Sequence, residues 1–341
     1  MLLDIPDLMG HEKETLYIIG NGFDRAHNLP TRYSDFHDWL MKDHQDFVEI
    51  IEAIFEGRDK TRFTNEEERP SLLWTDFEAA LGRIDAHTAM EYLGNKYDNL
   101  ETDRKALDLA TEEIRTLVYD VNSLMLEWSR HTPITIAQRL YNLSNASRYL
   151  TFNYTLTLEE GYDINTDQIL HIHGKVSEDN VIVGCERDVN RPLDNTNQGR
   201  RRYTKQINAE FNHFNKPVDD LIEGYEDFFQ SLTEVNRVVV IGHSLTEIDI
   251  PYISEVCQHV SPDTHWHFSA FSDKDHQNIR AFIDTYLGES YKNKYIFNVR
   301  LMMEDKDKPI ESKAQRPPEP KKVNPRNRRV NPKRYVIVTN I

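Results

Sequence analysis

Long hydrophobic runs and cysteine are both scarce in this chain of 341 residues. No stretch approaches the roughly 20 consecutive apolar residues that a membrane-spanning helix needs. The first residues, Met1 to Asp7, lack the basic start and the apolar run of a secretory signal. With only Cys185 and Cys257, a disulfide framework and a thiolate metal cluster are both excluded. From these absences we expect a cytoplasmic protein with no membrane partner.

Positive charge is also in short supply, because 57 acidic residues outnumber 41 Lys and Arg and give a net charge of −16. This balance argues against nucleic acid as the main ligand of the folded body, since such binding depends on neutralising phosphates. Residues 313–334 are the exception: nine basic residues and one acidic residue give +8, so the rest of the chain carries −24. We interpret 305–341 as a basic, Pro-rich tail that is solvated or docked on the protein itself, with binding of nucleic acid or an acidic partner as the alternative.

Short apolar runs alternate with helical patterns along the chain. Residues 15–19 and 237–241 are apolar runs that each end at a glycine, a pattern typical of buried parallel strands. Further strands are expected at 149–152, 168–172, 181–183 and 265–270, and helices at 37–57, 71–84, 104–129 and 204–234. This alternation predicts an α/β fold with a Rossmann-like parallel sheet flanked by helices. The expected division is a nucleotide-binding core at 1–36 and 146–300, a mostly helical insertion at 37–145, and the tail.

The first glycine loop is the strongest indication of a ligand. Its residues are Gly20, Asn21, Gly22, Phe23 and Asp24. Without side chains in the way, backbone N–H groups in such a loop can point at phosphate oxygens. The full dinucleotide fingerprint has a third glycine where this chain has Arg25. A plain strand-to-helix turn with Asp24 as the helix cap therefore remains the alternative.

Two middle strands are each followed by polar residues suited to a site. Asn153 follows the strand at 149–152, where its amide can donate to and accept from a sugar hydroxyl or a water. His171 and His173 are spaced to share one face of a strand, but no third metal ligand has matching local spacing, so we expect no metal. His173 stands at the strand end beside a glycine, where a substrate could approach, so a general-base role suits it better than metal binding, and a structural histidine is the alternative.

The second glycine loop follows the strand at 237–241. Its candidate binding residues are Gly242, His243, Ser244 and Asp249. A serine after a strand suggests the nucleophile of an α/β hydrolase, but that motif requires a glycine two residues later, where this chain has Thr246. A loop in which Ser244 contacts a phosphate or ribose and Asp249 contacts a polar ligand group needs fewer assumptions.

Taken together and in this order, the segments resemble the AbiH family, a group of bacterial proteins linked to abortive infection by phage. The resemblance is carried by these segments: Ile19-Gly20-Asn21-Gly22-Phe23-Asp24 with Leu29-Pro30-Thr31, Trp74 to Glu78, Phe152-Asn153-Tyr154-Thr155, His171-Ile172-His173-Gly174, and Ile241 to Leu245 with Asp249. It covers residues 15 to 275.

More distantly, the chain is similar to sirtuin-like NAD-processing domains used in phage defence. That similarity implies that Gly20 and Gly22 hold the phosphates of NAD and that Ser244 lies near the adenosine. It also implies that Asn153 faces the nicotinamide ribose and the attacking water, with His173 as the catalytic histidine. The zinc cysteines of sirtuins are missing here, which argues against protein deacetylation.

The function expected from the resemblance is that of an antiphage effector that binds NAD or a related nucleotide and hydrolyses its nicotinamide–ribose bond. One alternative is a module that senses NAD or ADP-ribose without turnover. Another is a hydrolase or nuclease that uses Ser244 or the pair His171 and His173. A homo-oligomer, and a phage component or nucleic acid acting as a trigger through the tail, are left open.

Overall fold

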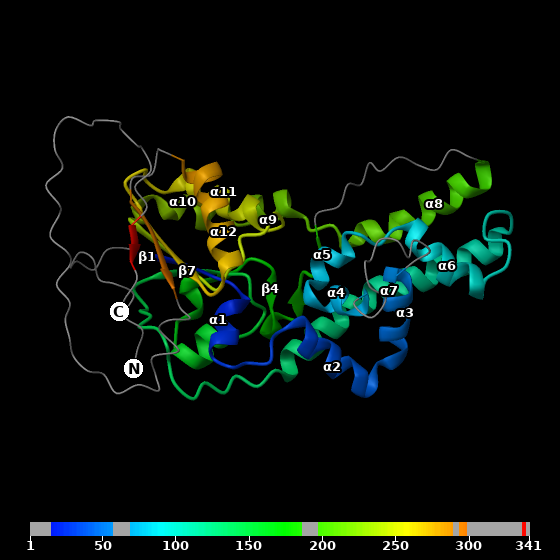
Figure 1. The fold of residues 1–341 in the computed structure, drawn as a ribbon, viewed down its shortest axis with the longest axis horizontal. Coiled ribbons are helices and arrows are strands. Elements are labelled where there is room, and N and C mark those ends of the chain that lie inside the picture. The colour runs from blue at the N-terminus through cyan, green and yellow to red at the C-terminus, as the bar shows by residue number, and fades with distance from the viewer. Residues whose placement is uncertain (1–14, 57–68, 186–196, 289–292, 299–335, 339–341) are drawn as a thin grey trace, which may run out of the picture.

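The computed structural model describes residues 15–56, 69–185, 197–288, 293–298 and 336–338. Seven strands form one sheet in the order β3-β2-β1-β6-β7-β8-β9, and each neighbouring pair is parallel (Figure 1). These strands are β1 (Thr15–Ile19), β2 (Arg148–Thr151), β3 (Ile169–His171), β6 (Arg237–Ile241), β7 (His265–Ala270), β8 (Asn293–Asn298) and β9 (Val336–Val338). Counted along the sheet, the first six have the Rossmann order 3-2-1-4-5-6. The predicted Rossmann-like α/β fold is confirmed.

Alternating side chains divide the sheet into two buried faces. On one face Leu16, Ile18, Val238 and Val240 pack in a core with the helices α10 (Glu226–Gln230), α11 (Ile250–His259) and α12 (Asp273–Phe282). On the other face Tyr17, Ile19 and Val239 pack against α1 (Asn21–Ala26) and the segment 140–164. Because both faces of β1 are covered, the strand is an apolar run without polar alternation.

The expected strand at 181–183 is not part of this sheet. Asn180–Val181 form β5, which pairs antiparallel with β4 (Gly174–Lys175) in a separate two-stranded hairpin. Gly174 has a φ of +77° and stands against Asn180, whose carbonyl oxygen would lie 2.2 Å from a Cβ at that position. The hairpin therefore begins at a position that accepts only glycine, directly after His173.

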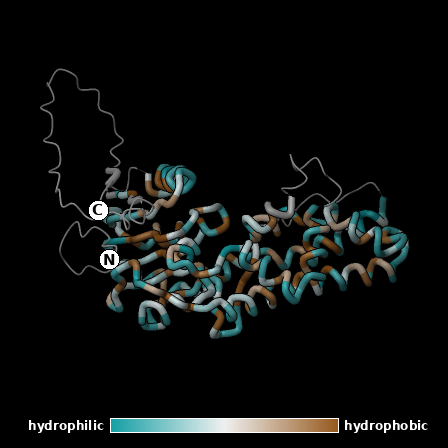
Figure 2. The backbone as a smooth tube through the Cα atoms, turned by 60° about the horizontal axis from the view of Figure 1, so that its bottom comes forward, coloured by the Kyte–Doolittle hydropathy of each residue, from teal (hydrophilic) through white to brown (hydrophobic). Residues whose placement is uncertain are grey.

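A helical lobe lies beside the sheet (Figure 1). It consists of α2 (Tyr33–Asp43), α3 (Gln45–Glu56), α4 (Arg69–Thr75), α5 (Phe77–Leu81), α6 (Ala86–Lys96), α7 (Arg104–His131) and α8 (Gln198–Phe211). Along its helices hydrophobic and hydrophilic residues alternate, as expected for helices that bury one side (Figure 2). Helix α8 follows β3 in sequence but shares its core with α7, so the lobe is larger than the predicted insertion at 37–145.

Three helices expected to be continuous are broken. The helix expected at 37–57 is interrupted at His44, between α2 and α3, and that at 71–84 is interrupted at Asp76, whose side chain accepts from the amide of Ala79 and caps α5. The helix expected at 204–234 ends in α8, and α9 (Val218–Gly224) begins after Pro217. Helix α8 ends at Phe211 and a 3-10 turn covers Asn212–Phe214. Pro217 lacks an amide hydrogen and disfavours helical backbone in the residue before it, so the helix does not resume at Lys216.

No helix in the described ranges is long and apolar enough to cross a bilayer. Most of the predicted basic tail, including residues 313–334, lies outside the described residues. Its segment Val336–Val338 is β9, which pairs with β8 at the edge of the sheet.

Candidate functional site

The strand order reverses between β1 and β6. In open parallel sheets, ligands bind at such a reversal, outside the carboxyl ends of the strands. Gly20 follows β1 and Gly242 follows β6. Asn153 and His173 follow β2 and β3 on the same side of the reversal. The topology therefore brings the ends of all four predicted loops to one sheet edge.

The two glycine loops are packed directly on each other. The amide of Gly22 donates to the carbonyl oxygen of Gly242 at 2.8 Å. A Cβ on Gly22 would lie 2.6 Å from the Cα of Gly242, and a Cβ on Gly20 would lie 2.6 Å from the Cα of His243. The amides of Gly20 and Phe23 also donate within the protein, to Ile241 and Gly20. Close packing thus explains these glycines, and phosphate binding by this loop stays a prediction.

The remaining residues of the first loop differ in exposure. Asn21 is exposed, and its side chain donates to the carbonyl oxygen of Thr31 at 2.7 Å. Phe23 is fully buried and stacks on Tyr141, so its side chain belongs to the core beneath the loop.

Asp24 does not cap the helix, contrary to the structural alternative considered for it. Helix α1 begins at Asn21 with Gly20 as its N-cap, and Asp24 lies inside the helix with 1% of its surface exposed. Its Oδ2 accepts from Thr155 at 2.6 Å, while its Oδ1 is buried and no described residue donates a hydrogen bond to it. Burial raises the pKa of Asp24 to about 6, against the opposing effect of the hydrogen bonds.

Asn153 and His171 make their hydrogen bonds to other groups of the protein. Asn153 donates from its side chain to the carbonyl oxygen of Gly20 at 3.3 Å, and its own carbonyl oxygen contacts His171 Nδ1 at 2.9 Å. The Nε2 of His171 contacts Glu159 at 3.0 Å. Both ring nitrogens of His171 are therefore engaged. Since β3 ends at His171, strand alternation does not extend to His173, and the two histidines contact different residues.

His173 is buried among aromatic rings and charged groups from several segments. Its ring makes edge contacts with Phe152 and Tyr252, at 5.5 and 5.4 Å between centroids. Its Nδ1 lies 3.4 Å from Lys216 Nζ, and its Nε2 has no hydrogen-bond partner among the described residues. Burial and the Lys216 ammonium lower the pKa of His173 to about 3, so the ring is neutral at physiological pH.

Asp249 stands at the N-cap of α11 but does not use its side chain to cap that helix. Its Oδ1 is buried 3.9 Å from His173 Nε2 and forms no hydrogen bond within the described part of the chain, and its Oδ2 lies 3.4 Å from His243 Nε2. Burial would raise the pKa of Asp249, but the Lys216 ammonium and the hydrogen bond from His243 outweigh it and lower that pKa below its usual value. The carboxylate is thus kept ionised. It forms a cluster with the side chains that it faces, His173, His243 and Lys216.

His243 is oriented by the backbone that follows it. Its Nδ1 accepts from the amide of Leu245 at 3.0 Å, which leaves the hydrogen on Nε2, facing Asp249. Leu245 has a φ of +51°, a conformation uncommon for a branched side chain, and is held there with its side chain buried in the sheet core. Ser244, between them, is exposed, and its carbonyl oxygen accepts from Asn278.

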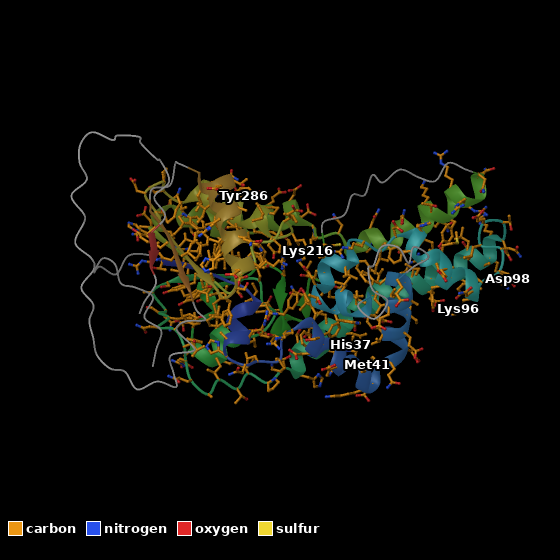
Figure 3. The ribbon with its side chains drawn as sticks, viewed as in Figure 1. His37, Met41, Lys96, Asp98, Lys216 and Tyr286 are labelled. Atoms are coloured by element: carbon orange, nitrogen blue, oxygen red, sulfur yellow. The ribbon has the colours of Figure 1, made fainter. Side chains whose placement is uncertain are left out.

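Lys216 and Glu78 complete the cluster, and sequence reasoning assigns neither of them a role. Lys216, between the sheet and the helical lobe (Figure 3), has a side chain that is 1% exposed. Its Nζ lies 3.1 Å from Glu78 and 3.8 Å from Asp249. Although burial opposes it, these two carboxylates raise the pKa of Lys216, which therefore stays charged. Glu78 belongs to a segment already recognised from the resemblance, whereas nothing local distinguishes Lys216 from a surface lysine.

The charge of Lys216 decides the hydrogen-bonding direction of His173. An ammonium group can only donate, so Nδ1 of His173 is the acceptor and the ring hydrogen lies on Nε2. A donor, His173 Nε2, therefore faces an acceptor, Asp249 Oδ1, at 3.9 Å. This separation is too long for a direct hydrogen bond. The hydroxyl of Tyr252, whose ring contacts His173, is also buried and has no hydrogen-bond partner in the ranges that the structure describes.

In the part of the chain that the structure describes, no group of three His, Cys, Asp or Glu could hold a metal ion. Comparison with curated proteins and with solved structures finds no match for this chain. The family model described as bacteriophage abortive infection AbiH matches residues 16–270, a span that includes both glycine loops, Glu78, Asn153, His173, Lys216 and Asp249. The chain therefore belongs to the AbiH family, whose role is in abortive infection by bacteriophage.

Proposed function

We propose that this AbiH protein acts in abortive infection by binding NAD, or a closely related nucleotide, and hydrolysing its nicotinamide–ribose bond. The observation that carries the proposal is the pair formed by His173 Nε2–H and Asp249 Oδ1, which are both buried, lie 3.9 Å apart and form no hydrogen bond with any described residue. A single hydroxyl or water oxygen suits this pair, because it can accept from the histidine while donating to the carboxylate.

The arrangement favours Asp249 as the proton acceptor in place of His173, the base expected from the sequence. Nε2 of His173, the nitrogen that Lys216 does not contact, already carries a hydrogen. His173 therefore orients the bound oxygen by donating a hydrogen bond to it. The C–N bond to nicotinamide breaks with its electron pair on the pyridine nitrogen. Water then attacks the ribose carbon and gives its proton to Asp249, with ADP-ribose as the second product. A weakly basic carboxylate is sufficient, because the ribosyl cation is highly electrophilic.

The charge of the cluster also suits glycosidic cleavage. The carboxylates of Glu78 and Asp249 outweigh the single ammonium of Lys216, and His173 is neutral. A net negative site stabilises the oxocarbenium-like transition state of glycoside cleavage. The same charge would oppose the negative charge that develops in phosphoryl transfer, which disfavours nuclease chemistry at these residues.

The hydrolase alternatives have weaker support. A nucleophilic serine needs a base within hydrogen-bond reach. The neighbouring His243 is engaged with the amide of Leu245 and with Asp249, so it does not activate Ser244. His171 is engaged at both nitrogens and does not pair with His173.

Incubation of the purified protein with NAD tests the proposal, with nicotinamide measured by chromatography, both alone and after addition of extract from phage-infected cells. We expect Asp249→Asn to lower nicotinamide release by about 100-fold or more, and His173→Gln to lower it by a similar factor. His87→Ala, which changes an exposed histidine of α6, is the matched control and should behave as the unaltered protein.

Phage plating on cells that express the same variants links the chemistry to defence. Protection and the fall in cellular NAD should be lost together in Asp249→Asn and kept in His87→Ala. If the unaltered protein releases no more nicotinamide than Asp249→Asn under either condition, hydrolysis is wrong. Calorimetric binding of NAD in that case would support the sensing alternative.

A further inference from the structure

We propose that Lys216 is a positioning residue that fixes the hydrogen-bonding direction of the candidate site, and that Glu78 of the helical lobe holds Lys216 in place. The catalytic consequence of this inference rests on the proposed function, whereas its structural part does not. It assigns the helical lobe a direct part in building the site at the sheet edge.

The first support is the set of contacts that Lys216 makes. Its ammonium lies 3.1 Å from Glu78 in α5, 3.4 Å from His173 after β3, and 3.8 Å from Asp249 before α11. These partners come from three segments far apart in sequence. A buried ammonium is retained only where such partners compensate its loss of hydration.

The second support is what the site would be without this ammonium. Without the ammonium, His173 could carry its ring hydrogen on either nitrogen. With the hydrogen on Nδ1, Nε2 would be an acceptor that faces another acceptor, Asp249 Oδ1. A ribose hydroxyl has one hydrogen to give and cannot satisfy two acceptors, whereas a water can donate to both. The ammonium therefore makes the pair complementary to a hydroxyl that accepts from His173 and donates to Asp249. Lys216 thus makes the pair complementary without touching the oxygen bound there.

The third support is how firmly Glu78 is held. Its Oε1 accepts from the amide of Gly184 at 3.1 Å and pairs with Lys216, and its Oε2 accepts from the hydroxyl of Tyr33 at 3.1 Å. Gly184 also leaves room for the lysine stem, since a Cβ there would lie 3.3 Å from Lys216 Cγ and 2.2 Å from the carbonyl oxygen of Phe214. The lobe therefore contributes a fixed carboxylate to the site.

Nitrogen NMR of protein with ¹⁵N-labelled histidine tests the inference directly, because the two neutral tautomers give different coupling patterns. The His173 signal is identified by its loss in His173→Gln. In the unaltered protein we expect the hydrogen on Nε2. In Lys216→Met, which keeps the length of the stem but cannot donate, we expect the hydrogen on Nδ1 or a mixture, whereas Lys216→Arg should restore the original tautomer.

Lys216→Met leaves Glu78 without its cation, and the variant can fail to fold. The double variant Glu78→Gln with Lys216→Met removes both charges at nearly constant volume and serves as the second test. We expect the same change of tautomer there, and a fall in nicotinamide release of roughly 10- to 100-fold, as for removal of groups that orient a catalytic residue. Lys216→Arg should recover part of that activity.

A hydrogen on Nδ1 of His173 in the unaltered protein, or an unchanged tautomer in the folded double variant, would overturn the inference. The tautomer is measured without NAD, so the two proposals fail separately. The expected tautomers without any release of nicotinamide would leave the positioning role standing and remove the hydrolysis. Release of nicotinamide with the wrong tautomer would do the reverse.

Discussion

Asp24 and His173 illustrate how burial acts on single ionisable residues in opposite ways. In both cases burial disfavours the charged form, which raises the pKa of the aspartate to about 6 and lowers that of the histidine to about 3. His173 stays neutral at physiological pH and is useful as a hydrogen-bond donor. Asp24 is ionised above pH 6 in a place that does not favour its charge, so it reduces stability there.

Replacement of Asp24 by asparagine should make stability less sensitive to pH. Because the folded-state pKa is about 6 and the ordinary value is 3.8, the folded protein binds the proton more tightly than the unfolded chain. The free energy of unfolding therefore falls as pH rises from about 4 to 6. The amide introduced by Asp24→Asn cannot ionise. The free energy of unfolding of the variant should therefore rise relative to that of the unaltered protein between pH 4 and 6, and this relative gain should reach at most roughly 3 kcal/mol at pH 7.

Urea unfolding at pH 4, 5, 6 and 7 measures this gain. Asp167→Asn, at an exposed aspartate, is the control. Parallel stability profiles for Asp24→Asn and the unaltered protein would mean that Asp24 is not desolvated as described. A constant offset between the two profiles has no bearing on the titration, because the buried amide alone can produce it.

At the scale of elements, the sheet edge depends on two loops that approach each other more closely than side chains permit. Gly22 should therefore be intolerant of alanine: the Cβ would lie 2.6 Å from the Cα of Gly242, and backbone on both sides cannot rotate away. We expect Gly22→Ala to lower the free energy of unfolding by about 1–3 kcal/mol, the usual cost of overpacking. Gly94→Ala is the matched control, since Gly94 lies in α6 and no atom of the described residues is within 4 Å of an added Cβ.

The control has its own expected sign. Alanine in an exposed helix interior should raise the free energy of unfolding by roughly 0.5–1 kcal/mol. Denaturant unfolding of the two variants gives the comparison. Equal stability of Gly22→Ala and Gly94→Ala would contradict the direct packing of the two loops.

The same scale shows which elements can be predicted from the sequence. The strands at 15–19, 237–241 and 265–270 are predicted at their observed bounds, because buried parallel strands are runs of apolar residues with clear ends. The break between Phe211 and Val218, which contains Lys216, is not predicted although Pro217 lies in it, because the helical pattern continues on both sides. That break is where the chain turns a lysine inward, so the error in the helix and the missed site residue have one cause.

Prediction of the site residues is limited in the same way, because the site depends on contacts between segments that are far apart in the sequence. The loops after β1, β2, β3 and β6 are placed at one edge by topology alone, which depends on the strand order. Whether a histidine donates or accepts depends on the partner of its other nitrogen, here Lys216, 43 residues away. Sequence patterns do not contain that contact, and so they cannot separate His171, engaged at both nitrogens, from His173.

At the scale of the whole molecule, the helical lobe and the sheet meet at the site through a few named contacts. Glu78 contacts Lys216, and Tyr154 after β2 packs against the hydrophobic core of the lobe. The far end of the lobe, around the turn 99–103 between α6 and α7, makes none of these contacts. Binding of a ligand that orders the site should therefore affect the end of the lobe that contacts the site and not its far end.

Hydrogen–deuterium exchange with and without saturating ADP-ribose measures this coupling. An oxygen bound between His173 and Asp249 restricts Lys216, which in turn restricts Glu78 and the amide of Gly184 that donates to it. We expect slower exchange in α5 and around Gly184, with no change at 99–103. In Glu78→Gln the protection should be confined to the sheet edge, because the ion pair that links the two parts is gone. Protection of the sheet edge with α5 and Gly184 unaffected in the unaltered protein would show that the lobe supports the site without responding to its ligand.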